Sequence, residues 1–535
     1  MRTTRVLLNG DIHTMDKRLP RAQAIAIAGN RVLAVGSDSE IQALLAPGVK
    51  AVDLAGRTVV PGLTDAHLHF MSYGISLKQV DLAEVPTLEE ALQRVAAGVA
   101  DTPAGNWVHG RGWDHSLWEG GAFPTRADLD RVAPDNPVYL RRKCGHVGWA
   151  NSRALELAGI TADTPNPFGG AIDRDLDSGE PTGIIKELAM DLVSDLFEEP
   201  TLEEGMEAIK TAMSNAHRLG ITGVHTMEGA VALSAFEQLE ANGELALRVL
   251  IQIPEENLDA AIQTGLRSGF GNARLRIGGV KMFADGALGA RTAYMIAPFE
   301  GSEDDCGISV ATADHLKEVV GKAAQAGIAS FVHAIGDRAN REVLNAIEAS
   351  RKAGHGRHLR HRIEHTQLLH PDDVPRLAEL GVIASMQPIH ATQDMLLADA
   401  NWGERSSGAY AFRSLLDSGA VLAFGSDSPV EDLNVMKGIH AAVTRRRADG
   451  SPGPEGWYPE QRLSVDEAVY AFTAGAAYAS GEEAIKGTLS AGNLADLVVL
   501  SQDIFTIDLM AILDTKVVAT MFDGRFVYDG EGLVQ

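Results

Sequence analysis

Between residues 58 and 484, apolar segments rich in β-branched residues alternate with helical segments, and this alternation is the strongest constraint on the fold. Capping boxes at Thr201–Glu204 and Ser464–Glu467 mark helix starts. The eight apolar segments are the one that ends at His69, then 221–227, 247–253, 275–284, 328–333, 359–365, 381–387 and 421–427. Eight strands that alternate with helices predict an α/β protein, a closed (β/α)8 barrel of the TIM type with its chemistry at the carboxyl ends of the strands.

The two ends of the chain show a different pattern, in which short strands are separated by turns. Gly29-Asn30 suits a hairpin turn between residues 24 and 35, and residues 517–528 have the same character. Neither end has enough strands to bury a core alone, so we expect both to join one small β-sandwich. The predicted domains are a sandwich of residues 1–57 and 485–535 and a barrel of residues 58–484.

Residues 70–200 do not follow the alternation and are too many for a connecting loop, so we predict an insertion after the first barrel strand. Because it leaves the barrel at the end of that strand, it is placed to cover the active face. The insertion is rich in aromatic residues, including Trp107, Trp113, Trp118 and Trp149. For each tryptophan, packing in the insertion's own core is at least as good an explanation as contact with a ligand.

The composition of the chain narrows the kinds of molecule that the protein is expected to bind. The chain has 47 basic and 72 acidic residues and a net charge of −25, which argues against nucleic acid and against an anionic membrane surface. Cys144 and Cys306 are the only cysteines, so a disulfide framework is excluded and a reducing compartment is expected. No stretch suits a signal peptide or a membrane span. We therefore expect a cytoplasmic protein that acts on a small molecule, and a homodimer is a common assembly at this size.

Side chains that bind metals recur where the carboxyl ends of the predicted strands meet. His67 and His69 lie two residues apart on one strand and therefore face the same way. His333, His365 and Asp427 end the fifth, sixth and eighth strands. Any one of them alone is ambiguous, because a single histidine is more often structural. Ligand-type residues at matching strand ends of one barrel instead predict a site for one or two divalent metal ions.

Lys281 lies within the apolar fourth strand and needs a separate argument, because an ammonium group cannot coordinate a cation. Desolvation would lower its pKa, and a neutral amine can react with carbon dioxide to give an anionic carbamate. Such a carboxylated lysine could bridge two metals about 3.5–4 Å apart. The alternative is a lysine paired with Asp285 or Glu187, which leaves a one-metal site. Glu187 is itself a candidate bridging carboxylate.

The motifs that carry these residues run from Pro61 to His69, Lys281 to Gly289, His333 to Asp337, Arg362 to His365, Gly425 to Pro429 and Gly492 to Leu500. Together they resemble the amidohydrolase superfamily, and more narrowly its amidohydrolase-3 branch, which includes N-substituted formamide deformylase. The resemblance implies a distorted barrel with a β-sandwich from both termini, binding zinc or another divalent metal. By the family pattern, one metal is held by His67, His69 and Asp427 and the other by His333 and His365, with carboxylated Lys281 between them.

Two motifs in the insertion, Gly112-Trp113-Asp114 and Gly145-His146, also resemble this branch. There they border the substrate pocket, so the resemblance implies that Trp113 and His146 contact the substrate.

The chemistry of such a site predicts hydrolysis of a non-peptide amide or related C–N bond. A metal lowers the pKa of bound water to about 7 and polarises the carbonyl under attack. Asp427 would accept the proton of the water and return it to the leaving nitrogen. Asp337 and Glu364 are candidates to orient His333 and His365.

Two other hypotheses remain open at this point. An esterase or lactonase would use the same attack on a different carbonyl. A catalytically silent relative would use the scaffold for binding or assembly, because fold alone does not fix function. All six ligand positions are filled in this chain, which favours an enzyme.

Overall fold

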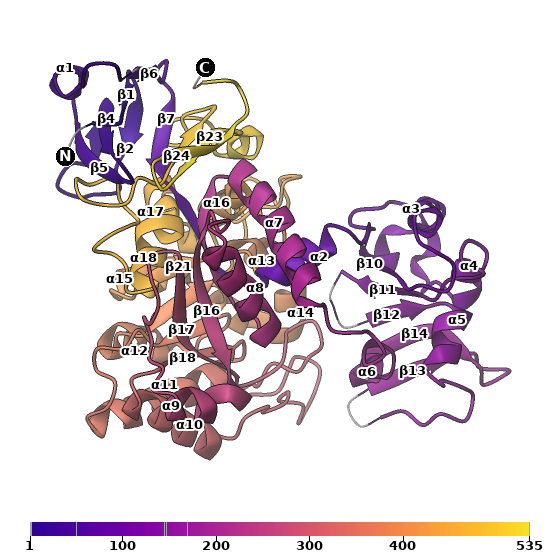
Figure 1. Ribbon diagram of the computed structural model, residues 1–535. Coiled ribbons are helices and arrows are strands. Elements are labelled where there is room, and N and C mark those ends of the chain that lie inside the picture. The colour runs from indigo at the N-terminus through magenta and orange to yellow at the C-terminus, as the bar shows by residue number, and fades with distance from the viewer. Residues whose placement is uncertain (1–2, 50, 144, 146, 168–169, 534–535) are drawn as a thin grey trace. The chain divides into compact units, whose positions relative to one another are not determined.

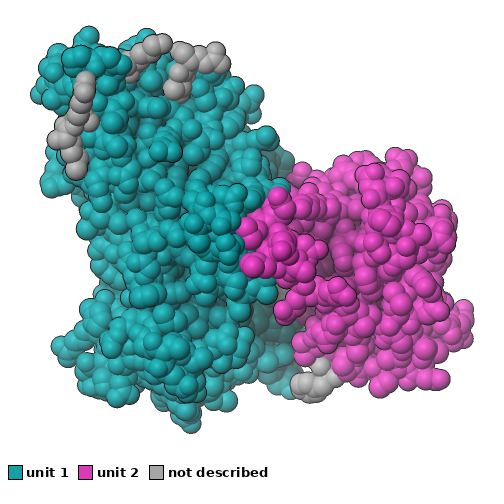
Figure 2. Space-filling view, viewed as in Figure 1, with its two compact units in different colours: residues 1–71, 209–535 teal, residues 72–208 magenta. Residues whose placement is uncertain are grey.

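The structure is a computed structural model that describes residues 3–49, 51–143, 145, 147–167 and 170–533 (Figure 1). The chain divides into two compact units (Figure 2). Unit 1 comprises Met1–Met71 and Ile209–Gln535, and unit 2 comprises Ser72–Ala208. In the described part of the chain, no helix is both long and apolar enough to cross a membrane.

The centre of unit 1 is a sheet of eight parallel strands in the order β21-β20-β19-β18-β17-β16-β15-β8. These strands are β8 (Leu63–Leu68), β15 (Ile221–Thr226), β16 (Arg248–Pro254), β17 (Leu275–Phe283), β18 (Ala329–Ala334), β19 (Arg362–His365), β20 (Ile383–Met386) and β21 (Leu422–Phe424). Backbone hydrogen bonds from Asp427 N to His67 O and from His69 N to Ser428 O bring the segment after β21 back to β8. The predicted eight-stranded α/β barrel is confirmed, and it is nearly closed.

Helices connect the barrel strands and also follow the last of them. They include α7 (Leu202–Arg218), α8 (Ala230–Ala241), α9 (Leu258–Gln263), α10 (Ala313–Gln325), α11 (Asp337–Lys352), α12 (Val374–Leu380), α13 (Pro388–Gln393), α14 (Met395–Trp402), α15 (Phe412–Asp417), α16 (Val435–Thr444), α17 (Val465–Tyr470) and α18 (Ala476–Ala479). The capping box at Ser464 and Glu467 starts α17 as predicted. Residue Gly381 ends α12 in the left-handed conformation, with φ of 59°, which costs glycine little.

The segment that leads into the barrel consists of two strands, although the sequence predicts one. Strand β7 (Thr58–Pro61) pairs with the C-terminal strand β22 (Leu497–Leu500), whereas β8 begins after Gly62 and joins the barrel. A Cβ atom on Gly62 would lie 2.2 Å from Oγ1 of Thr222, so only glycine allows this close approach. The chain therefore passes directly from one sheet into the other.

The terminal segments of unit 1 form two further sheets, with strand orders β5-β4-β1-β6 and β24-β23-β22-β7-β2-β3. Their remaining strands are β1 (Arg5–Leu8), β2 (Asp11–His13), β3 (Arg21–Ala22), β4 (Ala24–Ala28), β5 (Arg31–Gly36), β6 (Ala51–Asp53), β23 (Val517–Phe522) and β24 (Arg525–Asp529). A shared core contains Leu7, Ile25, Val59, Val499 and Met521, all buried. Both ends of the chain therefore contribute to one sandwich.

Unit 2 has its own six-stranded sheet, in the order β13-β14-β12-β11-β10-β9. Its main elements are α3 (Leu88–Ala100), α4 (Arg126–Asp130), α5 (Ser152–Leu157), β9 (Val80–Asp81), β10 (Val108–Trp113), β11 (Val138–Arg142), β12 (Val147–Ala150), β13 (Gly170–Arg174) and β14 (Pro181–Glu187). Trp113, Trp118 and Trp149 are buried in one hydrophobic cluster of this unit. The aromatic residues of the insertion therefore build its core.

A buried ion pair joins the barrel to the sandwich within unit 1. Arg248, at the start of β16, donates to Asp496 through Nε at 2.5 Å and through Nη2 at 2.9 Å. Its Nη2 also donates to Asp523 at 3.3 Å. Because the guanidinium is almost inaccessible to solvent, removal of a partner leaves a buried charge poorly compensated.

We expect Asp496→Ala to lower the free energy of unfolding by about 3 kcal/mol, the low end for a broken buried pair because Asp523 remains. Urea denaturation of the full chain measures this change. The control is Lys437→Ala, which removes an exposed ion pair with Asp432 and should stay within about 0.5 kcal/mol of the parent protein. Equally small losses in the two variants would contradict the role given to Asp496.

Candidate metal centre

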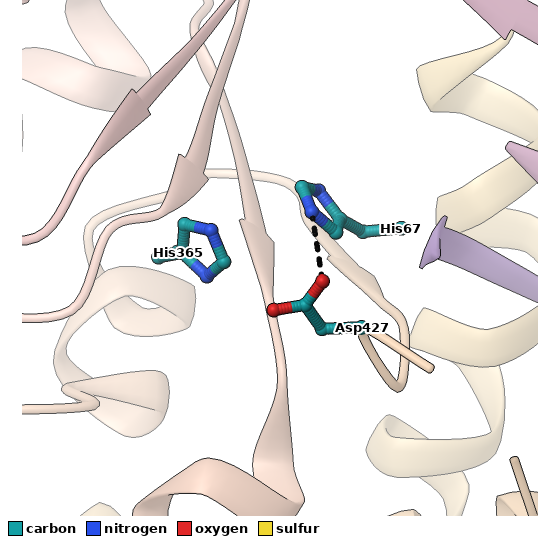
Figure 3. A group of neighbouring side chains, drawn as sticks. All are labelled: His67, His365 and Asp427. Atoms are coloured by element: carbon teal, nitrogen blue, oxygen red, sulfur yellow. Dashed lines mark ion pairs between the residues drawn. The ribbon is translucent and has the colours of Figure 1, made fainter. Parts of the chain in front are cut away.

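Three residues from distant parts of the chain meet at the carboxyl ends of the barrel strands. His67 lies on β8, His365 ends β19, and Asp427 follows β21. One ligand atom of each lies within 4.8 Å of the ligand atoms of the other two, and Figure 3 shows the side chains facing one another. The strands are parallel, so their carboxyl ends meet at one mouth of the barrel.

The other predicted histidines join the same group. Asp427 Oδ1 lies 3.4 Å from His67 Nε2 and 3.6 Å from His69 Nε2. The ring centroids of His333 and His365 are 4.5 Å apart, and those of His67 and His365 are 4.9 Å apart. Two ligand atoms on one tetrahedral ion, at about 2.0–2.1 Å each, lie about 3.4 Å from one another. The spacing therefore fits a divalent metal.

Hydrogen bonds fix which nitrogen of three imidazoles remains available. His67 Nδ1 donates to Glu364 Oε2 at 2.5 Å, and His365 Nδ1 donates to Gln387 Oε1 at 2.8 Å. His333 Nε2 donates to the carbonyl oxygen of Gly286 at 2.9 Å. Since these acceptors carry no proton, each neutral ring keeps a lone pair on its other nitrogen. That is the form in which histidine binds a metal.

Burial favours the neutral form of these rings, although at His67 the carboxylates Glu364 and Asp427 outweigh it and raise the pKa. Burial lowers the pKa of His333 to about 3 and the pKa of His365 well below the usual value. Burial would also raise the pKa of Asp427, but hydrogen bonds with His390 and His67 outweigh it and hold that pKa well below its usual range. The group thus combines the neutral imidazoles of His333 and His365 with an ionised carboxylate, a donor set that suits a divalent cation.

Two carboxylates predicted to orient His333 and His365 have other partners. Glu364 is fully buried and binds His67, as described above, with Arg362 Nε 2.8 Å from its other oxygen. Asp337 starts α11, where it accepts a hydrogen bond from Ile296 N at 2.8 Å. The groups that hold His333 and His365 are the Gly286 carbonyl and the Gln387 amide, so this part of the prediction was wrong.

Lys281 lies on β17, where its Nζ is 4.5 Å above the ring of Phe283. Burial lowers the pKa of Lys281 to about 8. Asp285, one partner considered for it, instead accepts backbone hydrogen bonds from Tyr294, Ile335 and Gly336. Among the described residues of unit 1, no carboxylate forms an ion pair with Lys281 within 4.0 Å. The Asp285 alternative is therefore not observed.

Sequence reasoning missed His390, which lies on α13 and is 8% exposed. Its Nε2 is 3.3 Å from Asp427 Oδ2, and its Nδ1 is 3.5 Å from Glu431. The two oxygens of Asp427 thus face different partners. Oδ1 faces His67 and His69, whereas Oδ2 faces His390. The signal in the sequence was weak, since this histidine follows the seventh strand within a helix.

The model of the amidohydrolase family matches residues 50–528 of the chain. The chain belongs to the amidohydrolase family. Protein LONG AFTER FAR-RED 3 of Arabidopsis thaliana is 34% identical over 98% of this chain and 91% of that protein. N-substituted formamide deformylase of Arthrobacter pascens is 30% identical over 98% of both chains. An uncharacterized metal-dependent hydrolase from Pyrococcus horikoshii OT3 has a crystal structure that matches with a TM-score of 0.78 and 32% identity, over 94% of this chain and 99% of that chain.

These matches confirm the resemblance predicted from the motifs, including its amidohydrolase-3 branch. The protein is a metal-dependent hydrolase of the amidohydrolase superfamily. Its predicted ligands His67, His69, His333, His365 and Asp427 converge, as that assignment requires.

Three predicted site residues of this amidohydrolase fall in unit 2. Trp113 is fully buried in that unit, and its indole nitrogen donates to Leu140 O at 2.9 Å, so the core-packing alternative accounts for its environment. Glu187 ends β14 with φ of 51°, and its role as a bridging carboxylate stays a prediction. His146 lies outside the described residues.

A cavity of about 730 Å³ in unit 1 adjoins Lys281. Its lining includes Glu228, Gln252 and the half-exposed ring of Phe283. Cavities of this volume accommodate small organic molecules. Of the six predicted metal ligands, Lys281 is the one that lines this cavity.

We expect Glu364→Gln to weaken binding of a probe Zn²⁺ ion by about 10–100-fold, because a neutral amide orients His67 less firmly. Titration of metal-free protein against a chromophoric chelator measures the affinity. The control is Glu482→Gln, another buried glutamate of unit 1, which pairs with Lys486 at 2.8 Å. Unchanged affinity in Glu364→Gln would show that the carboxylate does not support the site.

Proposed function

We propose that this amidohydrolase cleaves a non-peptide C–N bond of the amide type, such as that of an N-substituted formamide or another N-acyl compound. The observation that carries the proposal is the group of anchored imidazoles that faces Asp427. The name of the relative in Arthrobacter pascens, which aligns over nearly all of both chains, supports the formamide class. A cytoplasmic location and a homodimer remain predictions from the sequence.

Zinc is the proposed metal, because imidazole and carboxylate ligands at this spacing suit it. His67, His69 and Asp427 would hold one ion, and His333 and His365 would hold a second. When bound, the metal lowers the pKa of water to about 7 and polarises the substrate carbonyl.

Lys281 is proposed to carry a carbamate. Its ammonium is nearly buried and has no ion-pair partner among the described residues of unit 1, which is costly for a cation. Carboxylation replaces that cation with an anion whose two oxygens can serve as ligands between the two histidine groups.

Asp427 is proposed to move the proton. Its pKa is held low, so the carboxylate is ionised at neutral pH and can accept a proton from water. His390 contacts Oδ2 of this carboxylate and positions it. Asp427 would then deliver the proton to the leaving nitrogen, because a free amide anion is a poor leaving group.

We expect Asp427→Asn to retain bound metal but to lose at least about 100-fold in kcat, since an amide cannot accept the proton. Metal analysis and steady-state kinetics measure the two quantities on one sample. The control is Asp417→Asn, an exposed residue of α15, which should keep full activity. Full activity in Asp427→Asn would remove Asp427 from this role, and joint loss of metal and activity would make it a ligand alone.

The substrate class is tested with N-formyl amides, other N-acyl amides, esters and lactones, each assayed after chelation and again after addition of Zn²⁺. We expect turnover of amides that disappears with the chelator and returns with the metal. Preference for esters or lactones would contradict the proposed bond. Metal-loaded protein without turnover of any of them would instead favour a silent binding relative.

A further inference from the structure

A second group of metal-type side chains lies in the β-sandwich, where the two ends of the chain meet. Asp11 and His13 lie on β2, and Asp503 follows β22. One ligand atom of each lies within 4.8 Å of those of the other two. The predicted barrel ligands do not include these residues, and the proposed reaction does not use them.

The imidazole of His13 is the decisive member of this group. The residue is 2% exposed, and its Nε2 has no hydrogen-bond partner among the described residues. Nε2 lies 3.6 Å from Asp11 Oδ2 and 4.0 Å from Asp503 Oδ1. Both distances are too long for hydrogen bonds. The shorter distance equals the 3.6 Å between His69 and Asp427 at the barrel site, as for ligands that share an ion.

Neighbouring groups hold each of the three side chains in place. The ring of His13 stacks on Phe505, with centroids 3.5 Å apart and planes 10° apart. Arg21 donates to Oδ1 of Asp11, which leaves Oδ2 toward the histidine. Asp503 accepts from Phe505 N through Oδ1 at 3.1 Å and from Thr506 through Oδ2. These contacts therefore hold the three side chains in place before any ligand binds, which is also the role of supporting hydrogen bonds in metal sites.

Charge and the type of donor atom favour a transition-metal cation here. The two carboxylates outweigh the nearby guanidinium of Arg21, which already pairs with Asp11. An imidazole among the donors argues against Ca²⁺ and Mg²⁺, which take oxygen ligands.

We propose that Asp11, His13 and Asp503 bind a divalent transition-metal ion such as Zn²⁺, which links the N-terminal strand β2 to the segment after β22. The two carboxylates are partly exposed, so water can complete the coordination. The ligands come from opposite ends of the chain and meet only in the folded sandwich. Binding therefore stabilises the folded state.

The test compares the zinc content of full-length protein, equilibrated with excess Zn²⁺ and then desalted, with that of His13→Gln and Asp503→Asn. Each variant should hold one zinc per chain fewer than the parent and should keep its kcat, because the barrel site is untouched. The matched control is Asp508→Asn, in the same segment, which should hold as many zinc ions as the parent.

Equal zinc content in the parent, His13→Gln and Asp503→Asn would overturn the proposal, as would the same loss in Asp508→Asn. Asp503 is partly exposed, so its variant should fold even if His13→Gln does not. Since the measure is a difference of one ion between variants, it stands even if the barrel site holds an unexpected number of ions. Loss of activity with unchanged zinc content in either variant would likewise overturn the proposal, because the zinc content is its measure.

Discussion

The barrel interior is organised around the buried guanidinium of Arg362. It forms an ion pair of 2.8 Å with Glu364 on its own strand, β19, and donates to Ala66 O on β8. It also donates to Ser385 Oγ on β20 at 2.6 Å and to His225 Nδ1 on β15 at 2.9 Å. One side chain thus connects β8, β15, β19 and β20. A lone charge at this depth would be very costly, so the arginine and Glu364 stabilise each other.

Glu364 connects Arg362 to the site at the strand ends, because it accepts a hydrogen bond from His67. Burial would raise its pKa, but Arg362 and His67 hold the pKa far below the usual range, so the carboxylate stays ionised and keeps its bond to His67. The backbone adds a further constraint, since His365 and Asp427 have φ of 72° and 59°, in the left-handed region that most residues avoid. Strained residues of this kind concentrate at functional sites, where the surrounding structure holds them in place.

The strands and the ligand positions could be predicted because they depend on local periodicity. The two-residue spacing of His67 and His69 fixes their common face, and parallel strands bring their carboxyl ends together. The features that the sequence did not predict depend on tertiary contacts. The close approach at Gly62 divides one apparent strand into two, and a contact between β8 and β19, which are not paired in the sheet, makes Glu364 the partner of His67. His390 reaches Asp427 from a helix, which no strand pattern could indicate.

We propose that side chains from distant parts of the chain hold a divalent ion at one mouth of the barrel. The most direct measurement is anomalous X-ray diffraction from crystals of the zinc-loaded protein. We expect an anomalous peak about 2.0–2.1 Å from Nε2 of His67 and from a carboxylate oxygen of Asp427. A zinc-loaded structure with no peak near these atoms, and with the imidazoles turned toward other partners, would contradict it.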